Sequence, residues 1–180
     1  MSARVSTATA GDVVELAAVA AATFPLACPP SSTPENIAAF VATHLSAERF
    51  AEYVADPDRE VLVARAHRSI LGYAMLILGI GTDPDAARSV TMHPAVELSK
   101  IYVLPDHHGA GVAAALMGAA VERAATTGAR CIWLGVNQNN HRAQRFYGKH
   151  RFTVAGTKTF AVGAHLENDF VMVRALLDAV

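Results

Sequence analysis

The chain has 180 residues, of which 52% are hydrophobic and 17% are charged. This length fits one domain, and the composition excludes an intrinsically disordered chain. The formal net charge of −1 carries no information on a nucleic-acid partner. The longest apolar run is interrupted by glycines and is too short to span a bilayer, so we expect no membrane partner. Two cysteines, Cys28 and Cys131, make no disulfide framework, which predicts free thiols and a cytoplasmic protein.

Charge is distributed unevenly along the chain. Residues 1–99 carry 6 Lys and Arg against 11 Asp and Glu, whereas residues 100–180 carry 9 against 5. The asymmetry would match an anionic ligand on the C-terminal half and a cationic ligand on the N-terminal half. Solvated faces of unequal composition are the simpler explanation.

The first third of the chain predicts mostly helices. Ser32, Pro34 and Glu35 form a capping-box pattern, in which Ser32 caps a helix and Glu35 completes the box. Two prolines at 29–30 separate this helix from the one before it. In chain order, the expected elements are an edge strand at 4–8 and helices at 11–23, around 32–45 and at 46–56.

The remaining residues alternate between strands and helices. Expected in order are strands at 60–66 and 70–80, a polar loop at 81–94, a strand at 96–103, a turn at 105–110, a helix at 111–127 closed by Gly128, a strand at 131–136, a helix at 141–150, and strands at 152–160 and 170–174. This order predicts an α/β protein with a mixed sheet and helices on both faces. The unit 96–136 is expected to be a right-handed parallel crossover.

A glycine-containing turn lies between a predicted strand and the long predicted helix. Gly109 and Gly111 occupy alternate positions, and the small Ala113 follows. Such a turn can point backbone N–H groups into one concavity, and the N-terminus of a helix adds positive partial charge. The pattern therefore favours a phosphate-bearing ligand, although a purely structural turn has the same glycines. The Gly-Lys-Ser/Thr ending of a P-loop is absent.

A second segment follows the next predicted strand. It begins with Asn140, which can cap a helix, and continues with Ala143, Phe146 and Tyr147. Both segments follow the carboxyl ends of neighbouring strands, which is the edge where open α/β sheets bind ligands. The two segments together predict one ligand site.

These motifs resemble those of the GCN5-related N-acetyltransferases. The segment 108–113 is similar to the pyrophosphate loop of that family, and Asn140-x-x-Ala143-x-x-Phe146-Tyr147 is similar to its second motif. The resemblance covers about residues 4–174. It implies the mixed α/β fold of that family over residues 1–180 as one domain, with an acetyl-CoA-binding core at 97–152 and variable acceptor-side helices at 24–58.

A finer resemblance is to the PaiA-type spermidine/spermine N-acetyltransferases. It is carried by Glu97-Leu98-Ser99-Lys100-Ile101-Tyr102-Val103, by Trp133-Leu134-Gly135-Val136, and by Gly156-Thr157-x-Thr159-Phe160-x-x-Gly163. The chain departs from that pattern at three places. Asn137-Gln138 replaces Trp-Glu, His108 stands where Arg or Gln is typical, and Arg151 replaces Gly. The backbone N–H of His108 is still expected to face a phosphate.

The resemblance implies acetyl-CoA as the co-substrate and no metal; the adjacent His107 and His108 also lack metal-ligand spacing. Asn140 is expected to bind the co-substrate, to cap its helix, or to do both. The expected cofactor-binding residues are Ile101, Tyr102, Val103, His108, Gly109, Ala110, Gly111, Val112, Ala113, Asn140, Ala143 and Tyr147.

Two residues are the predicted catalytic groups. The resemblance makes Tyr147 the general acid that protonates the departing thiolate; a core tyrosine is the alternative. Glu97 is the candidate base or amine-positioning carboxylate, and strand alternation places it on one face with Ser99 and Ile101. An exposed glutamate at a strand edge is its alternative.

The expected reaction is acetyl transfer from acetyl-CoA to a primary amine by direct attack. The PaiA-type resemblance implies spermidine or spermine as the first acceptor. The segment 24–58 is consistent with it, because an acidic wall there (Glu35, Glu48, Glu52, Asp56 and Asp58) would attract a polycation. A protein or peptide amine is the second, and a non-catalytic acyl-CoA sensor is the alternative. A nucleic-acid partner is not expected, and the resemblance suggests a homodimer.

Overall fold

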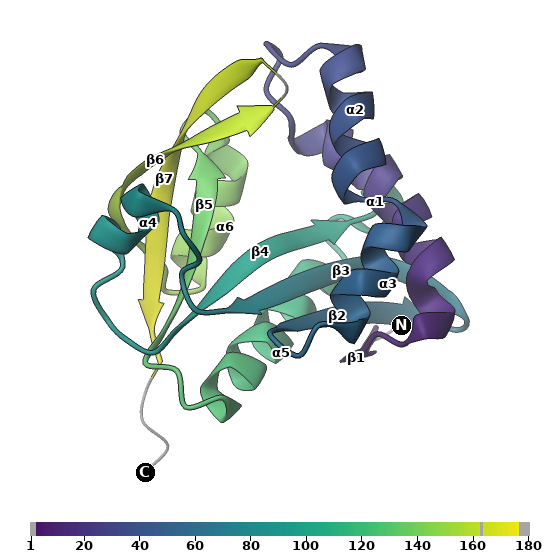
Figure 1. Cartoon of the computed structure of the whole chain (residues 1–180). Helices are drawn as coiled ribbons and strands as arrows, with labels where there is room; N and C mark the ends of the chain where they lie inside the picture. Colours follow the sequence, from purple (N-terminus) through teal and green to yellow (C-terminus); the bar gives the residue numbers. More distant parts are fainter. Residues whose placement is uncertain (1–2, 163, 177–180) are drawn as a thin grey trace.

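The computed structural model describes residues 3–162 and 164–176, so Gly163 of the motif above lies outside the described residues. The described chain forms a seven-stranded sheet in the order β1-β2-β3-β4-β5-β7-β6 (Figure 1). The pair β4–β5 is parallel and the other neighbouring pairs are antiparallel, which confirms the predicted mixed sheet. The strands are β1 (Arg4–Thr7), β2 (Arg59–Ala66), β3 (Ser69–Leu78), β4 (Ala95–Val103), β5 (Cys131–Asn137), β6 (Thr153–Val162) and β7 (His165–Ala175).

Helices cover both faces of this sheet (Figure 1). The helices are η1 (Ala10–Asp12), α1 (Val13–Ala27), α2 (Pro34–His44), α3 (Ala47–Ala55), α4 (Pro84–Ser89), η2 (Pro105–His107), α5 (Val112–Thr126) and α6 (His141–Lys149). One core joins α5 and the inner face of α6 to the sheet, and a second core joins α1, α2 and α3 to the opposite face. Burial on both faces explains why β3 and β5 are almost uniformly apolar.

Capping side chains set several helix starts. Thr33, rather than the predicted Ser32, caps α2, because its hydroxyl accepts the N–H of Asn36 at 3.2 Å. Ser46 caps α3 by accepting the N–H of Arg49, as its position predicts. Each cap satisfies one of the donors that a helix N-terminus leaves without a partner.

The predicted loop at 81–94 contains a helix, α4, so that prediction was wrong. Asp83 caps this six-residue helix by accepting the N–H groups of Asp85 and Ala86. Ala86 and Val90 are buried against Trp133 and its neighbours on β5 and β7. Tertiary packing therefore holds a helix too short and too polar to show a periodic pattern.

The parallel strands β4 and β5 form a wedge. They pair at Ala95↔Cys131, Val96↔Ile132 and Glu97↔Trp133 and then diverge (Figure 1). From Leu98 onward, the edge of β4 that faces β5 lies open. An open edge presents backbone N–H and C=O groups that can pair with an extended ligand. The wedge thus supplies a ligand site at the edge predicted from the sequence.

A β-bulge in β4 changes the predicted alternation. Met75 on β3 pairs with Lys100 and Leu76 pairs with Leu98, so Ser99 is the extra residue. After the bulge, Ile101 packs into the core under α5, whereas Tyr102 packs into the core under α1–α3. The prediction that Glu97 shares a face with Ile101 was therefore wrong. One extra residue reverses every side chain that follows it.

By length and composition alone, the helical stretch Ala10–Ala27 is long and apolar enough to cross a membrane. It is also the only such stretch among the described residues. In this fold its inner face is part of a protein core, because Leu16, Ala20 and Phe24 are buried against the sheet and α3. Helices at the core of a globular domain pass the same test.

Candidate active site

A cleft of about 280 Å³ fills the wedge between β4 and β5. Its floor is β4 from Glu97 to Tyr102, and its second wall comes from the ends of β5, β6 and β7 with α6. The third wall is the end of α1 and the middle of α2. Several predicted site residues therefore line one cavity, namely Glu97, Ile101, Tyr102, Asn140, Ala143 and Tyr147.

The glycine turn leads into the N-terminus of α5. Gly109 has a φ of +79° and Gly111 a φ of +80°, in the left-handed region that side chains with a Cβ avoid. A Cβ built at either glycine would meet nothing within 4 Å, so the space beside this turn is open. Gly111 is the N-cap and has no side chain, which leaves the first N–H groups of α5 free of a helix acceptor. The turn fits an anionic group such as a phosphate.

Two backbone groups of the predicted loop are occupied. The N–H of His108 donates to the carbonyl of Pro105 at 3.1 Å, and the N–H of Ala110 donates to His107 at 3.3 Å. The prediction that the backbone N–H of His108 faces a phosphate was therefore wrong. The 3₁₀ turn η2 and the turn after it use these two N–H groups. The first-turn N–H groups of α5 have no acceptor among the described residues.

The imidazole of His108 has a bridging position instead. Its Nε2 donates to the carbonyl of Val103 at 2.8 Å, so Nδ1 is the acceptor nitrogen, and Arg142 Nη2 donates to it at 3.2 Å. His108 thereby connects the end of β4 to the start of α6. It also holds the guanidinium of Arg142 beside the glycine turn. In the PaiA-type pattern that the sequence resembles, Arg or Gln is typical at the position of His108.

The pairing of β4 with β3 sets the direction of the β4 backbone groups. The N–H of Leu104 donates to Leu71 on β3, and backbone groups alternate in direction along a strand. The amide groups of Ile101 and Val103 therefore face away from β3, toward the wedge. The Val103 side chain is buried, and its carbonyl is the one that His108 uses.

Helix α6 is placed by Asn140, whose Oδ1 accepts the N–H of Ala143 at 3.1 Å. This cap confirms one of the two roles predicted for Asn140. Ala143 and Tyr147 follow at helical spacing and line the cleft, while Phe146 packs against His150. The cap therefore sets which face of α6 meets the cleft.

Two tyrosines meet inside the cleft. Tyr147 is packed edge-to-face against Phe146 and Phe152, and burial raises its pKa to about 12. Burial also raises the pKa of Tyr102, and Tyr147, Cys28 and Asp169 act on it in the same direction. Both phenols are therefore protonated at neutral pH and can donate a proton or a hydrogen bond.

Glu97 lies at the closed end of the wedge, where β4 still pairs with β5. Burial raises the pKa of its carboxyl, and the charges of Lys158, Lys100 and Arg59 oppose that rise. Lys100 is three residues away on the same face because of the bulge, and burial lowers the pKa of its ammonium. Both side chains are partly buried, line the cleft and act on each other electrostatically.

Asp169 is a site residue that sequence reasoning missed. It lies on β7, is 7% exposed and lines the cleft. Burial raises the pKa of its carboxyl to about 6, although Lys158 lowers it. The available signal was a carboxylate directly before the apolar run Phe170-Val171-Met172-Val173.

The acceptor side of the cleft is apolar where an acidic wall was predicted. Segment 24–58 contributes Phe24, Ala27, Cys28, Pro29 and Phe40 to the lining, and the rings of Phe24 and Phe40 stack at 4.4 Å. Within the described part of the chain, Glu35, Glu48, Glu52, Asp56 and Asp58 lie outside this lining.

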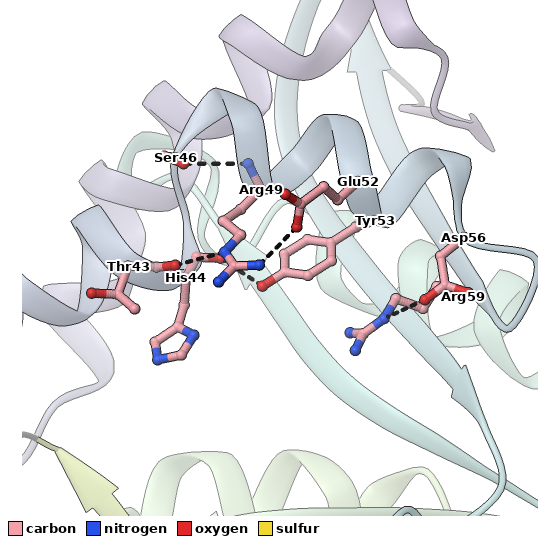
Figure 2. Close-up of polar contacts among 8 residues, drawn as sticks. All are labelled: Thr43, His44, Ser46, Arg49, Glu52, Tyr53, Asp56 and Arg59. Carbon is pink, nitrogen blue, oxygen red and sulfur yellow. Dashed lines mark hydrogen bonds and ion pairs between the residues drawn. The ribbon is translucent and has the colours of Figure 1, made fainter.

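Two of those carboxylates, Glu52 and Asp56, form ion pairs with arginines (Figure 2). Arg49 pairs with Glu52 at 2.7 Å, and Arg59 pairs with Asp56 at 3.0 Å. Tyr53 donates its hydroxyl to the carbonyl of His44 (Figure 2). Two of the five acidic residues are thus paired with arginines and none of the five lines the cleft, so the predicted acidic wall was wrong.

Cys131 and Trp133 are buried, and the Trp133 indole donates to the carbonyl of Gly79 at 3.1 Å. Both cysteines are free thiols. Within residues 3–162 and 164–176, no group of three His, Cys, Asp or Glu side chains is arranged to hold a metal ion.

The comparisons with known proteins agree with this geometry. The model of the acetyltransferase (GNAT) family matches residues 24–152. Uncharacterized N-acetyltransferases of Mycobacterium tuberculosis and Mycobacterium bovis are 57% identical over 166 residues, covering 92% of this chain and 99% of each relative. The crystal structure of the PaiA N-acetyltransferase from Thermoplasma acidophilum in complex with coenzyme A has a TM-score of 0.78 at 20% identity, and the match covers 97% of this chain and 99% of that one.

The wedge, the glycine turn at a helix N-terminus and the tyrosine of α6 define an acyl-group transferase. The chain belongs to the GNAT family and is an N-acetyltransferase.

Proposed function

We propose that this N-acetyltransferase transfers the acetyl group of acetyl-CoA to a primary amine by direct attack. One observation carries the proposal. The open β4 edge and the Tyr147 phenol line the same cleft, and the Gly109–Gly111 turn lies between the end of β4 and the start of α5. A long ligand with phosphates at one end and a thioester at the other needs these three features in this order.

The residues that would hold the co-substrate follow from their positions. The first-turn N–H groups of α5, which include those of Val112 and Ala113, and the guanidinium of Arg142 would bind phosphate, with Gly109 and Gly111 leaving space beside the backbone. The amide groups of Ile101 and Val103 would pair with the pantetheine arm, and Tyr102, Asn140, Ala143 and Tyr147 would contact its thioester end. His108 and Ala110 would contribute by shaping the glycine turn, and their backbone N–H groups would not bind the phosphate directly.

Acetyl-CoA supplies a thioester, and the protein must manage the protons. A free amine has a pKa near ~10.4 and is mostly protonated at neutral pH, while a departing thiolate has a conjugate acid near ~8.5. Tyr147 would protonate this thiolate as the C–S bond breaks, because its raised pKa keeps the phenol protonated until then. Glu97 would hold the acceptor ammonium near the closed end of the wedge.

The acceptor is the finer part of this proposal. Glu97 and Asp169 favour a cationic acceptor, and spermidine and spermine are the first ones to test. The stacked Phe24 and Phe40 favour a second candidate, a peptide or protein amine with apolar groups beside the nitrogen. The free thiols of Cys28 and Cys131 agree with a cytoplasmic location. A homodimer stays a prediction.

Free-thiol release from acetyl-CoA tests the proposal. The amines are spermidine, spermine, a lysine-containing peptide, a peptide with a free N-terminus and an aminoglycoside, each run with wild type and Tyr147→Phe. We expect turnover of at least one amine and a slower rate in the variant. Coenzyme A binding without turnover of any amine would favour the sensor alternative.

A further inference from the structure

Asp169 lacks a hydrogen-bond donor at the centre of the site. Its Oδ1 is buried and has no hydrogen-bond partner among the described residues. A buried carboxylate oxygen without a donor is costly, and native structures seldom keep one without a reason. Asp169 also lines the cleft, so a ligand in the cleft can reach the carboxylate.

The charged and polar neighbours of Asp169 leave it without a donor because they have other partners. Lys158 lies opposite it on β6, but its ammonium binds Asp83 at 2.8 Å. Asn137 lies opposite it on β5, but its amide donates to Glu167 at 3.4 Å. These contacts hold both potential donors away from Oδ1.

Two further neighbours relate Asp169 to the chemistry. The charge of Asp169 raises the pKa of Tyr102, and Tyr147 acts on Tyr102 in the same way. Asp169 and Tyr147 therefore both act on the Tyr102 hydroxyl, and all three residues line the cleft. Gly135 leaves room beside the carboxylate, because a Cβ there would stand 3.4 Å from Asp169 Oδ2. Glu97 faces the lysines and Arg59 at the closed end of the wedge instead.

From this placement we infer that Asp169 is the catalytic base that accepts the proton of the acceptor ammonium. The inference rests on the function proposed above and assigns Glu97 to amine positioning. The ammonium would supply the donor that Oδ1 lacks.

The proton and electron balance of the step is complete. The ammonium gives one proton to Asp169, and the freed nitrogen lone pair forms a bond to the thioester carbonyl carbon. The C–S bond breaks, its electron pair leaves with sulfur, and Tyr147 protonates that sulfur. The remaining surplus proton on the new amide nitrogen returns to the Tyr147 phenolate. Asp169 then releases its proton to solvent, so one ammonium ion and one acetyl-CoA give one amide, one thiol and one proton.

The electrostatics of Asp169 suit this role. Its pKa of about 6 lies closer to neutrality than that of an ordinary aspartic acid, so it is ionised at neutral pH and yet a better base. The groups that face it are Lys158 on β6, which lowers this pKa, Glu167 on β7, which raises it, and Tyr102 on β4. The acidic limb of the activity profile should report this carboxyl.

The test compares wild type with Asp169→Asn and with Asp58→Asn, an identical change at an exposed position away from the cleft. Rates are measured from about pH 5 to about pH 9 with acetyl-CoA and the amine that the panel identifies. The same amine, fluorinated beside its reactive nitrogen to lower its pKa, is the second probe. Coenzyme A affinity and thermal melting report whether each variant is folded.

We expect Asp169→Asn to lose about 100-fold in kcat/KM, to bind coenzyme A normally, and to lack the acidic limb near pH 6. Its defect should shrink with the fluorinated amine, which needs less help to lose its proton. A structural role would not depend on the basicity of the acceptor. Asp58→Asn should behave like wild type.

A second variant keeps Asp169 in place. Lys158→Gln removes the charge that lowers the Asp169 pKa, so the acidic limb should move to higher pH. An Asp169→Asn rate within about threefold of wild type, or an acidic limb that neither variant alters, would overturn the inference and leave the acetyltransferase proposal standing. Absence of turnover by wild type on every amine would overturn the proposed function and, with it, the role of Asp169.

Discussion

Replacing Gly111 by Ala tests two features of the glycine turn separately, namely its left-handed backbone conformation and its open space for a phosphate. Gly111 has a φ of +80° at the start of α5, and Gly128 has a φ of +78° just beyond the end of the same helix. A Cβ meets nothing within 4 Å at either position. Both substitutions therefore cost the left-handed strain alone, about 1–2 kcal/mol each. For a chain of this length, the melting temperature should fall by about 2–8 °C.

The two variants should differ in ligand binding. The Cβ of Gly111→Ala would occupy the space beside the first-turn N–H groups of α5, where we place a phosphate. Loss of one hydrogen bond to a charged group costs about 1.5–3 kcal/mol, which corresponds to about a 10- to 150-fold weaker Kd. Gly128 lies at the opposite end of the helix, so Gly128→Ala should bind coenzyme A as wild type does.

Isothermal titration with coenzyme A and thermal melting of both variants provide the assay. Equal destabilisation with a Kd change confined to Gly111→Ala would support a phosphate site at this turn. If both variants bind coenzyme A with the affinity of wild type, the turn has a structural role only and the phosphate assignment is refuted.

Three further outcomes are expected. Tyr147→Phe should lower kcat by about 100-fold while coenzyme A affinity, measured by titration, stays unchanged, because only the proton donor is lost; an equal loss of affinity would contradict the acid role. The raised pKa of Asp169 means that the folded protein loses stability as pH rises from about 4 to about 6; Asp169→Asn should therefore be more stable than wild type by up to about 3 kcal/mol at pH 8 and equal to it near pH 4 in urea unfolding. Ser46→Ala should cost about 1 kcal/mol in the same measurement, because it removes the cap of α3, and the exposed Ser69→Ala serves as its control.

Short sequence patterns predicted those turns and helices whose conformation depends mainly on residues close by in the chain. The glycine turn, α5 and its closing Gly128 follow from backbone preferences that a few neighbouring residues set. The cleft-lining residues of α6 also follow from a short motif, since Asn140 caps the helix and helical spacing does the rest. These positions were predictable because their conformations need little help from the rest of the chain.

The missed features depend on contacts between distant residues. The bulge at Ser99 is defined only by how β4 pairs with β3, and helix α4 is held by burial of Ala86 and Val90 under β5 and β7. Asp169 gains its role from strands β5 and β6 beside it and from Tyr102 across the wedge. The acidic residues of α3 failed as a wall because arginines three residues away neutralise two of them.

The short pairing between β4 and β5 affects how the protein unfolds. Three residue pairs and the helix α5 join the sheet's first four strands to its last three. A ligand that pairs along β4 and also contacts α6 would bridge the two parts of the sheet, whose strands pair with each other directly only at these three residue pairs. Hydrogen exchange should therefore slow most at the outer ends of β4 and β5 when coenzyme A binds, and least at Val96 and Ile132. Binding of the co-substrate would then couple local unfolding of the two parts of the sheet into a single cooperative event.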